Sequence, residues 1–262
     1  MTVFTPKHDI SNKNHPALPL TVNFIDRFLN KYKLSKTKFQ LLGIVALSVA
    51  LKITSDKLPS IDELTSLTAE TYNEFHIQKL EQIILQELDF KLLPPLTQNF
   101  YTHYLINTGA GEDNDLPTTK QYRTYSALFC QFLCEMALLD YGLTIFYEPA
   151  EVAIAVVVLL RTCLNILLLK PKNNKHLFLQ IGKTEPSLLE NIRDKGVVSE
   201  KIVGFIEDTG GDEPVNKIEG VVNGLVKLWK GILRQKPNPQ KESITAILFK
   251  YKVVLEIGYK NV

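Results

Sequence analysis

The chain has 262 residues, 45% apolar and 22% charged, which is the composition of a soluble globular protein with room for two domains. Its 30 basic residues are balanced by 28 acidic ones, so it lacks the basic excess of a dedicated nucleic-acid binder. The three cysteines suit a reducing compartment, and neither a secretory signal nor a convincing membrane span is recognised. We therefore expect a protein of the cytoplasm or nucleus, without nucleic-acid or membrane partners.

The first third of the chain is patterned as a set of helices. Apolar spacing predicts a helix over Leu20–Asn30, and Ser35 is then a plausible N-cap for a second helix that reaches Ile53. This second helix is apolar nearly all round, so we expect it to be the most buried helix of its lobe. Two further helices are predicted over Ile61–Leu67 and Tyr72–Leu88.

A double proline, Pro94-Pro95, separates this part from the rest, because proline is not tolerated inside a helix. Further helices are predicted near Thr97–Asn107, Tyr122–Asp140, Pro149–Leu168, Val198–Asp208, Pro214–Leu233 and Lys241–Leu255, with a polar loop over Gly109–Thr119. The sequence thus predicts an all-α protein of two tandem helical lobes, each of about five helices. Its expected divisions are a polar tail over residues 1–19, a first lobe over 20–95, and a second over 96–262 with an irregular insertion near 170–197.

The sequence contains only weak matches to short motifs for phosphate binding, metal binding or catalysis. Gly182-Lys183-Thr184 ends like a phosphate-binding loop, but the glycine required five positions earlier is Leu177, so we interpret the match as chance. Cys130 and Cys134 lie on one helix face without a histidine at ligand spacing, so we expect no metal and no cofactor. No Ser/His/Asp or Cys/His set is identifiable, and we expect the protein not to be an enzyme.

Isolated charges interrupt the most apolar helices of the first lobe. Asp26 and Arg27 are expected to have partners, because a charge is costly to bury without one. Lys52 ends the most apolar helix, and Glu81 lies among the leucines and isoleucines of the helix over Tyr72–Leu88. Two interpretations stay open: an internal Lys52–Glu81 ion pair, or two groups that contact a partner protein.

Several blocks of the first lobe, in the same order and spacing, resemble the cyclin box of the mitotic A/B type. They are Thr21–Leu29, Phe39–Lys52, Tyr72, Leu80–Phe90 and Pro94-Pro95. The second lobe is similar in outline to the C-terminal cyclin fold through Ser126–Asp140 and Tyr147–Ala155, and the likeness is thin beyond Leu169. The resemblance implies two tandem cyclin-like lobes.

The resemblance also implies a binding site. Lys52 and Glu81 match a lysine and a glutamate that hydrogen-bond to the activation-helix region of a cyclin-dependent kinase, with Ile53, Leu85 and Phe90 as the apolar surround.

Two further roles come from the same likeness. Asp26 would be a structural residue that holds helices together, forming with Arg27 a structural charge pair. Gln40 and Leu41 would lie in a groove where some cyclins dock substrate peptides.

The sequence departs from the family in three places. The helix with an Arg- and Trp-containing motif that usually precedes the Thr21 helix is not recognised, Thr54-Ser55-Asp56 replaces an acidic pair, and residues 1–19 hold no Arg-x-x-Leu degradation signal. Because exposed apolar surface is costly, we expect a partner chain to cover the flank that the first helix would cover.

The resemblance implies a non-catalytic regulatory subunit that binds a cyclin-dependent kinase in cell-cycle control, as part of an obligate hetero-complex. The alternative is a cyclin-fold structural subunit of a larger assembly without kinase regulation, which the missing helix favours. A B-type transcription-initiation factor ranks last, since neither basic DNA-reading helices nor a zinc ribbon is found.

Overall fold

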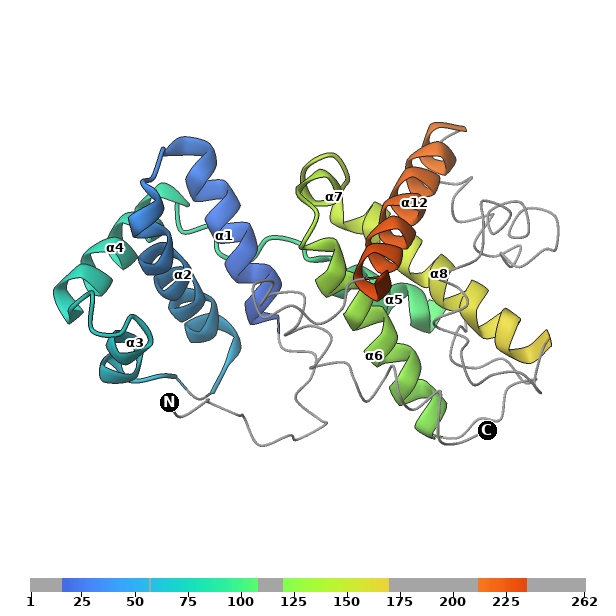
Figure 1. Cartoon of the computed structure of the whole chain (residues 1–262), viewed down its shortest axis with the longest axis horizontal. Helices are drawn as coiled ribbons and strands as arrows, with labels where there is room; N and C mark the ends of the chain where they lie inside the picture. Colours follow the sequence, from blue (N-terminus) through green and yellow to red (C-terminus); the bar gives the residue numbers. More distant parts are fainter. Residues whose placement is uncertain (1–15, 57, 108–119, 170–211, 235–262) are drawn as a thin grey trace. The chain divides into compact units, whose positions relative to one another are not determined.

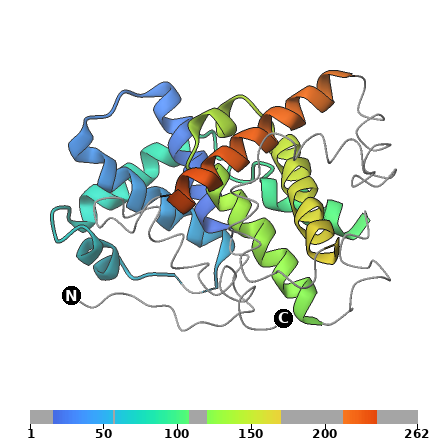
Figure 2. The same cartoon turned by 45° about the vertical axis from the view of Figure 1, so that its right-hand side comes forward.

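A computed structural model describes residues 16–56, 58–107, 120–169 and 212–234 of the chain, shown in Figures 1 and 2. Helices make up the regular structure of these ranges, and no strand occurs in them. The chain divides into two compact units between Leu96 and Thr97. The expected all-α fold class is therefore confirmed.

The first unit is built around one central helix. Its elements are α1 (Ala17–Lys31), the 3-10 turn η2 (Lys36–Lys38), α2 (Phe39–Thr54), α3 (Ile61–Leu67) and α4 (Glu74–Glu87). Helix α2 contacts α1, α3 and α4 (Figure 1). It supplies more buried residues than any other helix of the unit, as its apolar composition predicted. By length and apolar composition alone, residues 36–54 could cross a membrane, and 39% of this segment is buried within the protein.

Local sequence signals set several of the helix starts. Ser60 caps α3 by accepting from the Glu63 N–H (3.2 Å), while the Glu63 carboxylate accepts from the Ser60 N–H (2.8 Å). Ser35 does not cap as expected, because its hydroxyl lies 2.9 Å from the Thr37 hydroxyl and makes no capping bond. The chain instead enters α2 through η2.

The second unit is organised around α8 (Figure 2). Its described helices are α5 (Thr97–Asn107), α6 (Lys120–Ala137), α7 (Tyr141–Ile145), α8 (Pro149–Leu169) and α12 (Asp212–Arg234). Helix α8 contacts α5, α6 and α12, and its residues 152–160 are all buried. Helix α6 ends at Ala137, three residues before the predicted end at Asp140, and the Asp140 carboxylate then caps α7 by accepting from the Gly142 N–H (2.8 Å).

Several sequence-based expectations lie outside the described residues. These are the helices over Val198–Asp208 and Lys241–Leu255, the loop over Gly109–Thr119, the insertion near 170–197, and most of the tail over residues 1–19. The expectation that the family's first helix is missing concerns this same tail.

Two helical glycines differ in the space around them, and we predict opposite effects of alanine at the two positions. A Cβ at Gly224 would lie 2.8 Å from Cδ2 of the buried Leu143, whereas a Cβ at Gly43 of α2 would meet nothing within 4 Å. Alanine gains about 0.5–1 kcal/mol over glycine in a helix, but overpacking a core costs about 1–3 kcal/mol. Gly43→Ala should therefore stabilise and Gly224→Ala destabilise in denaturant unfolding. Equal effects of the two substitutions would contradict this packing.

Candidate functional site

Lys52 and Glu81 meet on the surface of the first unit. Lys52 lies in the last turn of α2 and Glu81 in the middle of α4, and the Lys52 Nζ donates to the Glu81 Oε1 at 2.5 Å. The two side chains are 47% and 18% exposed. They form an ion pair with each other, and solvent still reaches both.

This ion pair contributes little to the stability of the fold. Exposed pairs are worth about 0–1 kcal/mol, because water screens the attraction and both side chains lose conformational freedom. Neither residue supplies a large apolar surface to the core. A change of charge here should therefore be tolerated by the unit, and any functional effect can be measured separately.

The three apolar residues of the candidate surface differ in their exposure. Ile53 follows Lys52 in the chain, and Leu85 lies one turn beyond Glu81 on α4. Both are partly buried and pack against the core of the unit. The Phe90 N–H donates to the Leu85 carbonyl (3.0 Å), and the Phe90 side chain is 65% exposed. The five residues named from the sequence thus comprise a solvent-accessible ion pair, two half-buried aliphatic groups and one exposed aromatic ring.

Helix α4 ends in a left-handed corner at Asp89 and Phe90. Their φ angles are 51° and 54°, in the region that favours glycine. The Phe90 N–H bonds to the Leu85 carbonyl and the Asp89 N–H to the Gln86 carbonyl, both at 3.0 Å, which is the Schellman arrangement. In this arrangement the Glu87 carbonyl has no backbone partner inside the helix, whereas the Leu88 carbonyl accepts from the Lys91 N–H (2.9 Å).

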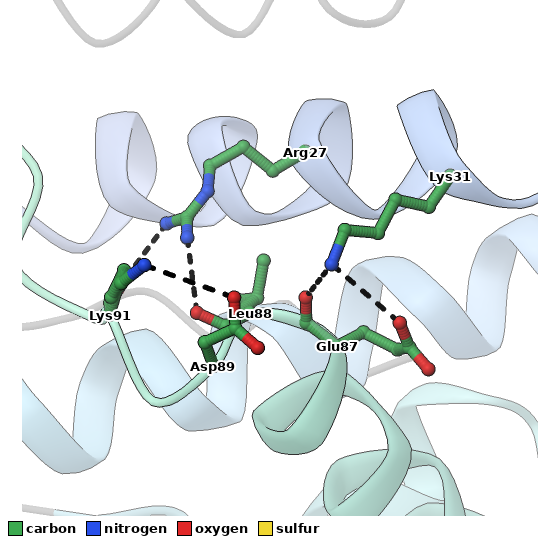
Figure 3. A network of polar contacts seen from close by, with 6 residues as sticks. All are labelled: Arg27, Lys31, Glu87, Leu88, Asp89 and Lys91. Carbon is green, nitrogen blue, oxygen red and sulfur yellow. Dashed lines mark hydrogen bonds and ion pairs between the residues drawn. The ribbon is translucent and has the colours of Figure 1, made fainter.

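Two cations from α1 donate to backbone carbonyls at this corner (Figure 3). The Arg27 guanidinium donates to the Lys91 carbonyl (2.8 Å) and to the Leu88 carbonyl (3.3 Å). The Lys31 ammonium donates to the Glu87 carbonyl (2.5 Å) and lies 3.7 Å from the Glu87 carboxylate. Positive charge is favourable at the C-terminal end of a helix dipole. The sequence drew attention to Arg27 but missed Lys31, because an exposed lysine at a helix end interrupts no apolar pattern.

Asp26 and Arg27 do not pair with each other. Arg27 has the carbonyl partners given above, while no described residue hydrogen-bonds to or pairs with the Asp26 carboxylate. Partial burial raises the pKa of Asp26 above its usual range, because the charged form loses hydration.

Asp26→Asn is therefore expected to raise stability at neutral pH and to have no effect in acid. An aspartate whose folded pKa exceeds its unfolded pKa binds its proton more readily in the folded state, so stability is lost as pH rises between the two values. The amide does not ionise and escapes this loss. Thermal melts of both proteins across acidic and neutral pH measure the difference, and identical melts at pH 7 would contradict it.

The two residues expected in a docking groove differ in exposure. Gln40 is exposed in the first turn of α2, and its amide donates to the Leu67 carbonyl (3.4 Å). Leu41 is only 7% exposed and belongs to the core of the unit. The exposed apolar side chains near this end are Phe39 and Leu67, which sequence reasoning did not name.

The second unit buries several ionisable side chains in its core, among them Tyr101, Cys134 and Glu135. Burial is the main cause that raises the pKa of the Cys134 thiol and of the Tyr101 phenol, with the neighbouring thiols and Glu135 adding to it. Within the described ranges, no three His, Cys, Asp or Glu side chains lie close enough together to hold a metal ion.

Part of the chain is similar to known proteins. Residues 7–93 match the family model described as "Cyclin, N-terminal domain". Cyclin-A3-1 of Oryza sativa subsp. japonica is 32% identical over 149 residues, which cover 57% of this chain and 38% of the relative. G2/mitotic-specific cyclin-B2 of Oryzias javanicus is 33% identical over 153 residues, 58% of this chain and 35% of the relative. The similarity thus spans a little over half of this chain and well under half of either relative.

Proposed function

We propose that the protein is a non-catalytic regulatory subunit that binds a cyclin-dependent kinase in cell-cycle control, because residues 7–93 match the N-terminal cyclin domain and the relatives compared above are cyclins. It would act in the cytoplasm or nucleus and order the kinase's activation helix by contact, without contributing a catalytic group. The surface that we assign to this contact comprises Lys52, Ile53, Glu81, Leu85 and Phe90.

The observation that carries the proposal is the solvent-accessible Lys52–Glu81 ion pair. Each member retains hydrogen-bonding capacity beyond the pair, since an ammonium has three donors and a carboxylate has several acceptor sites. The contact between them also restricts the Lys52 side chain before any partner binds, which lowers the entropy cost of docking. Ile53, Leu85 and Phe90 add apolar area around these polar groups, as protein interfaces require.

The same proposal gives Gln40 a part in docking substrate peptides, with Leu41 supporting the start of α2 from the core. Gln40 offers a side-chain amide at the surface, beside the exposed ring of Phe39.

One observation favours the alternative of a structural subunit without kinase regulation. Lys52 and Glu81 are already paired within the chain, so they do not need an external partner. Under this alternative the pair would serve only to join α2 and α4.

Recovery of partners from the native cell tests the two functions. The full chain carrying an affinity tag is purified, the accompanying chains are identified by mass spectrometry, and kinase activity is measured with and without the chain. A cyclin-dependent kinase that co-purifies and is activated supports the proposal. Recovery of other assembly subunits without a kinase would reject it in favour of the structural alternative.

A further inference from the structure

The corner after α4 places an aromatic side chain on a strained backbone conformation. Asp89 and Phe90 are consecutive non-glycine residues with positive φ, and bulky residues rarely adopt this conformation. The Phe90 ring is nevertheless 65% exposed, so burial of the ring does not account for the conformation. Backbone hydrogen bonds close the corner, and contacts from another helix add to them.

A second corner in the same unit serves as an internal comparison. Ala69 and Glu70, after α3, have φ angles of 51° and 57° and the same pattern of backbone hydrogen bonds. There the side chains are a methyl group and a solvated carboxylate, and no arginine or lysine of the described ranges donates to the corner's carbonyls. The Gln40 amide of α2 does donate to the Leu67 carbonyl before that corner (3.4 Å). Among the described residues, a guanidinium that bridges the carbonyls on either side of two left-handed residues is therefore particular to the corner that carries Phe90.

Arg27 forms that clamp. Its two terminal nitrogens reach the carbonyls of Leu88 and Lys91, which lie on either side of Asp89 and Phe90 (Figure 3). A planar guanidinium with fixed donors holds both carbonyls at a set separation, which a single ammonium does less well. Lys31, by contrast, donates only to Glu87, before the corner begins.

We propose that Arg27 is a positioning residue: it holds the left-handed corner at Asp89 and Phe90 and so presents the Phe90 ring for partner binding. The inference rests on the proposed function, in which Phe90 contacts a cyclin-dependent kinase. Arg27 itself acts through the corner, by way of its bonds to the Leu88 and Lys91 carbonyls.

A double-mutant cycle tests the proposal in the full chain. Arg27→Met keeps the aliphatic stem and removes both donors. It should weaken binding to a cyclin-dependent kinase by at least about tenfold, the effect of losing one charge-assisted hydrogen bond. In a Phe90→Ala background the same substitution should weaken binding less than about twofold further. A merely structural role of Arg27 would give equal losses in both backgrounds.

Matched variants and a second measurement distinguish failure of the Arg27 clamp from failure of the proposed function. Lys31→Met removes a cation from the same helix but leaves the corner bridged, so it should bind like the wild type. Asp89→Gly, which suits a left-handed residue, should restore part of the binding lost in Arg27→Met. Hydrogen exchange of the Asp89, Phe90 and Lys91 amides should accelerate in Arg27→Met, and unchanged exchange would overturn the clamp. If the wild-type chain binds no kinase, the proposed function is rejected, and with it the partner role of Phe90, while exchange alone decides the clamp.

Discussion

Exchanging the two charges in the double variant Lys52→Glu/Glu81→Lys should leave the fold intact and abolish most kinase binding. The variant keeps an ion pair between α2 and α4, because the two side chains still meet with opposite charge. Toward a partner, however, the hydrogen-bond donor and acceptor have changed places. Position 52 now carries the carboxylate acceptor, and position 81 carries the ammonium donor. Truncating one member of a buried interfacial charge pair costs about 2–5 kcal/mol, so the affinity should fall at least about thirtyfold.

The single variants and a control complete this test. Lys52→Glu places two carboxylates side by side and should also lose binding, with little change in the thermal melt because the native pair is exposed. Lys33→Glu changes the net charge equally at an exposed position outside the candidate site and should bind normally. Isothermal titration against the kinase measures each affinity. If the double exchange restored the binding lost in Lys52→Glu, the pair would act only within the chain.

Phe24→Ala should produce a large loss of stability in the first unit, about 3–5 kcal/mol. The ring of Phe24 is fully buried on α1 within the core that α2 completes. Its removal forfeits the burial of a large apolar surface and leaves a cavity that the surrounding helices fill only in part. Unfolding in denaturant, followed by circular dichroism, measures the change.

Phe75→Ala is the matched control for this substitution. The Phe75 ring is 65% exposed on α4, where it contacts the His76 ring edge-on and lies beneath the Lys79 ammonium. Its loss should cost less than about 1 kcal/mol, the range of an exposed cation–π contact. Comparable losses for the two variants would contradict the placement of α1 against α2.

The likeness to a known family could be found from residues alone, and the reason is physical. The blocks Thr21–Leu29 and Phe39–Lys52 are helices whose apolar faces form one core, so their residue types are constrained at helical spacing. Asp26 and Arg27 were marked by the same reasoning, since a charge in an apolar helix calls for an explanation. The pattern did not reveal that Arg27 would donate to backbone carbonyls, whereas no residue of the described ranges pairs with Asp26.

What the sequence by itself determined is the helical class, the approximate extent of most helices and the identity of isolated charges. These depend on local periodicity, capping residues and proline, all of which act within a few residues. The short α7 was missed because its start depends on a single Asp140 carboxylate inside an otherwise continuous apolar pattern.

Only the tertiary structure decided which groups meet. Lys52 and Glu81 are 29 residues apart, and their contact depends on how α2 packs against α4. Arg27 reaches backbone carbonyls 61 and 64 residues away, and every residue has a carbonyl, so no residue type could mark these partners beforehand. The left-handed corner at Asp89 and Phe90 was equally hidden, because neither residue is a glycine and contacts from another helix satisfy the corner's carbonyls.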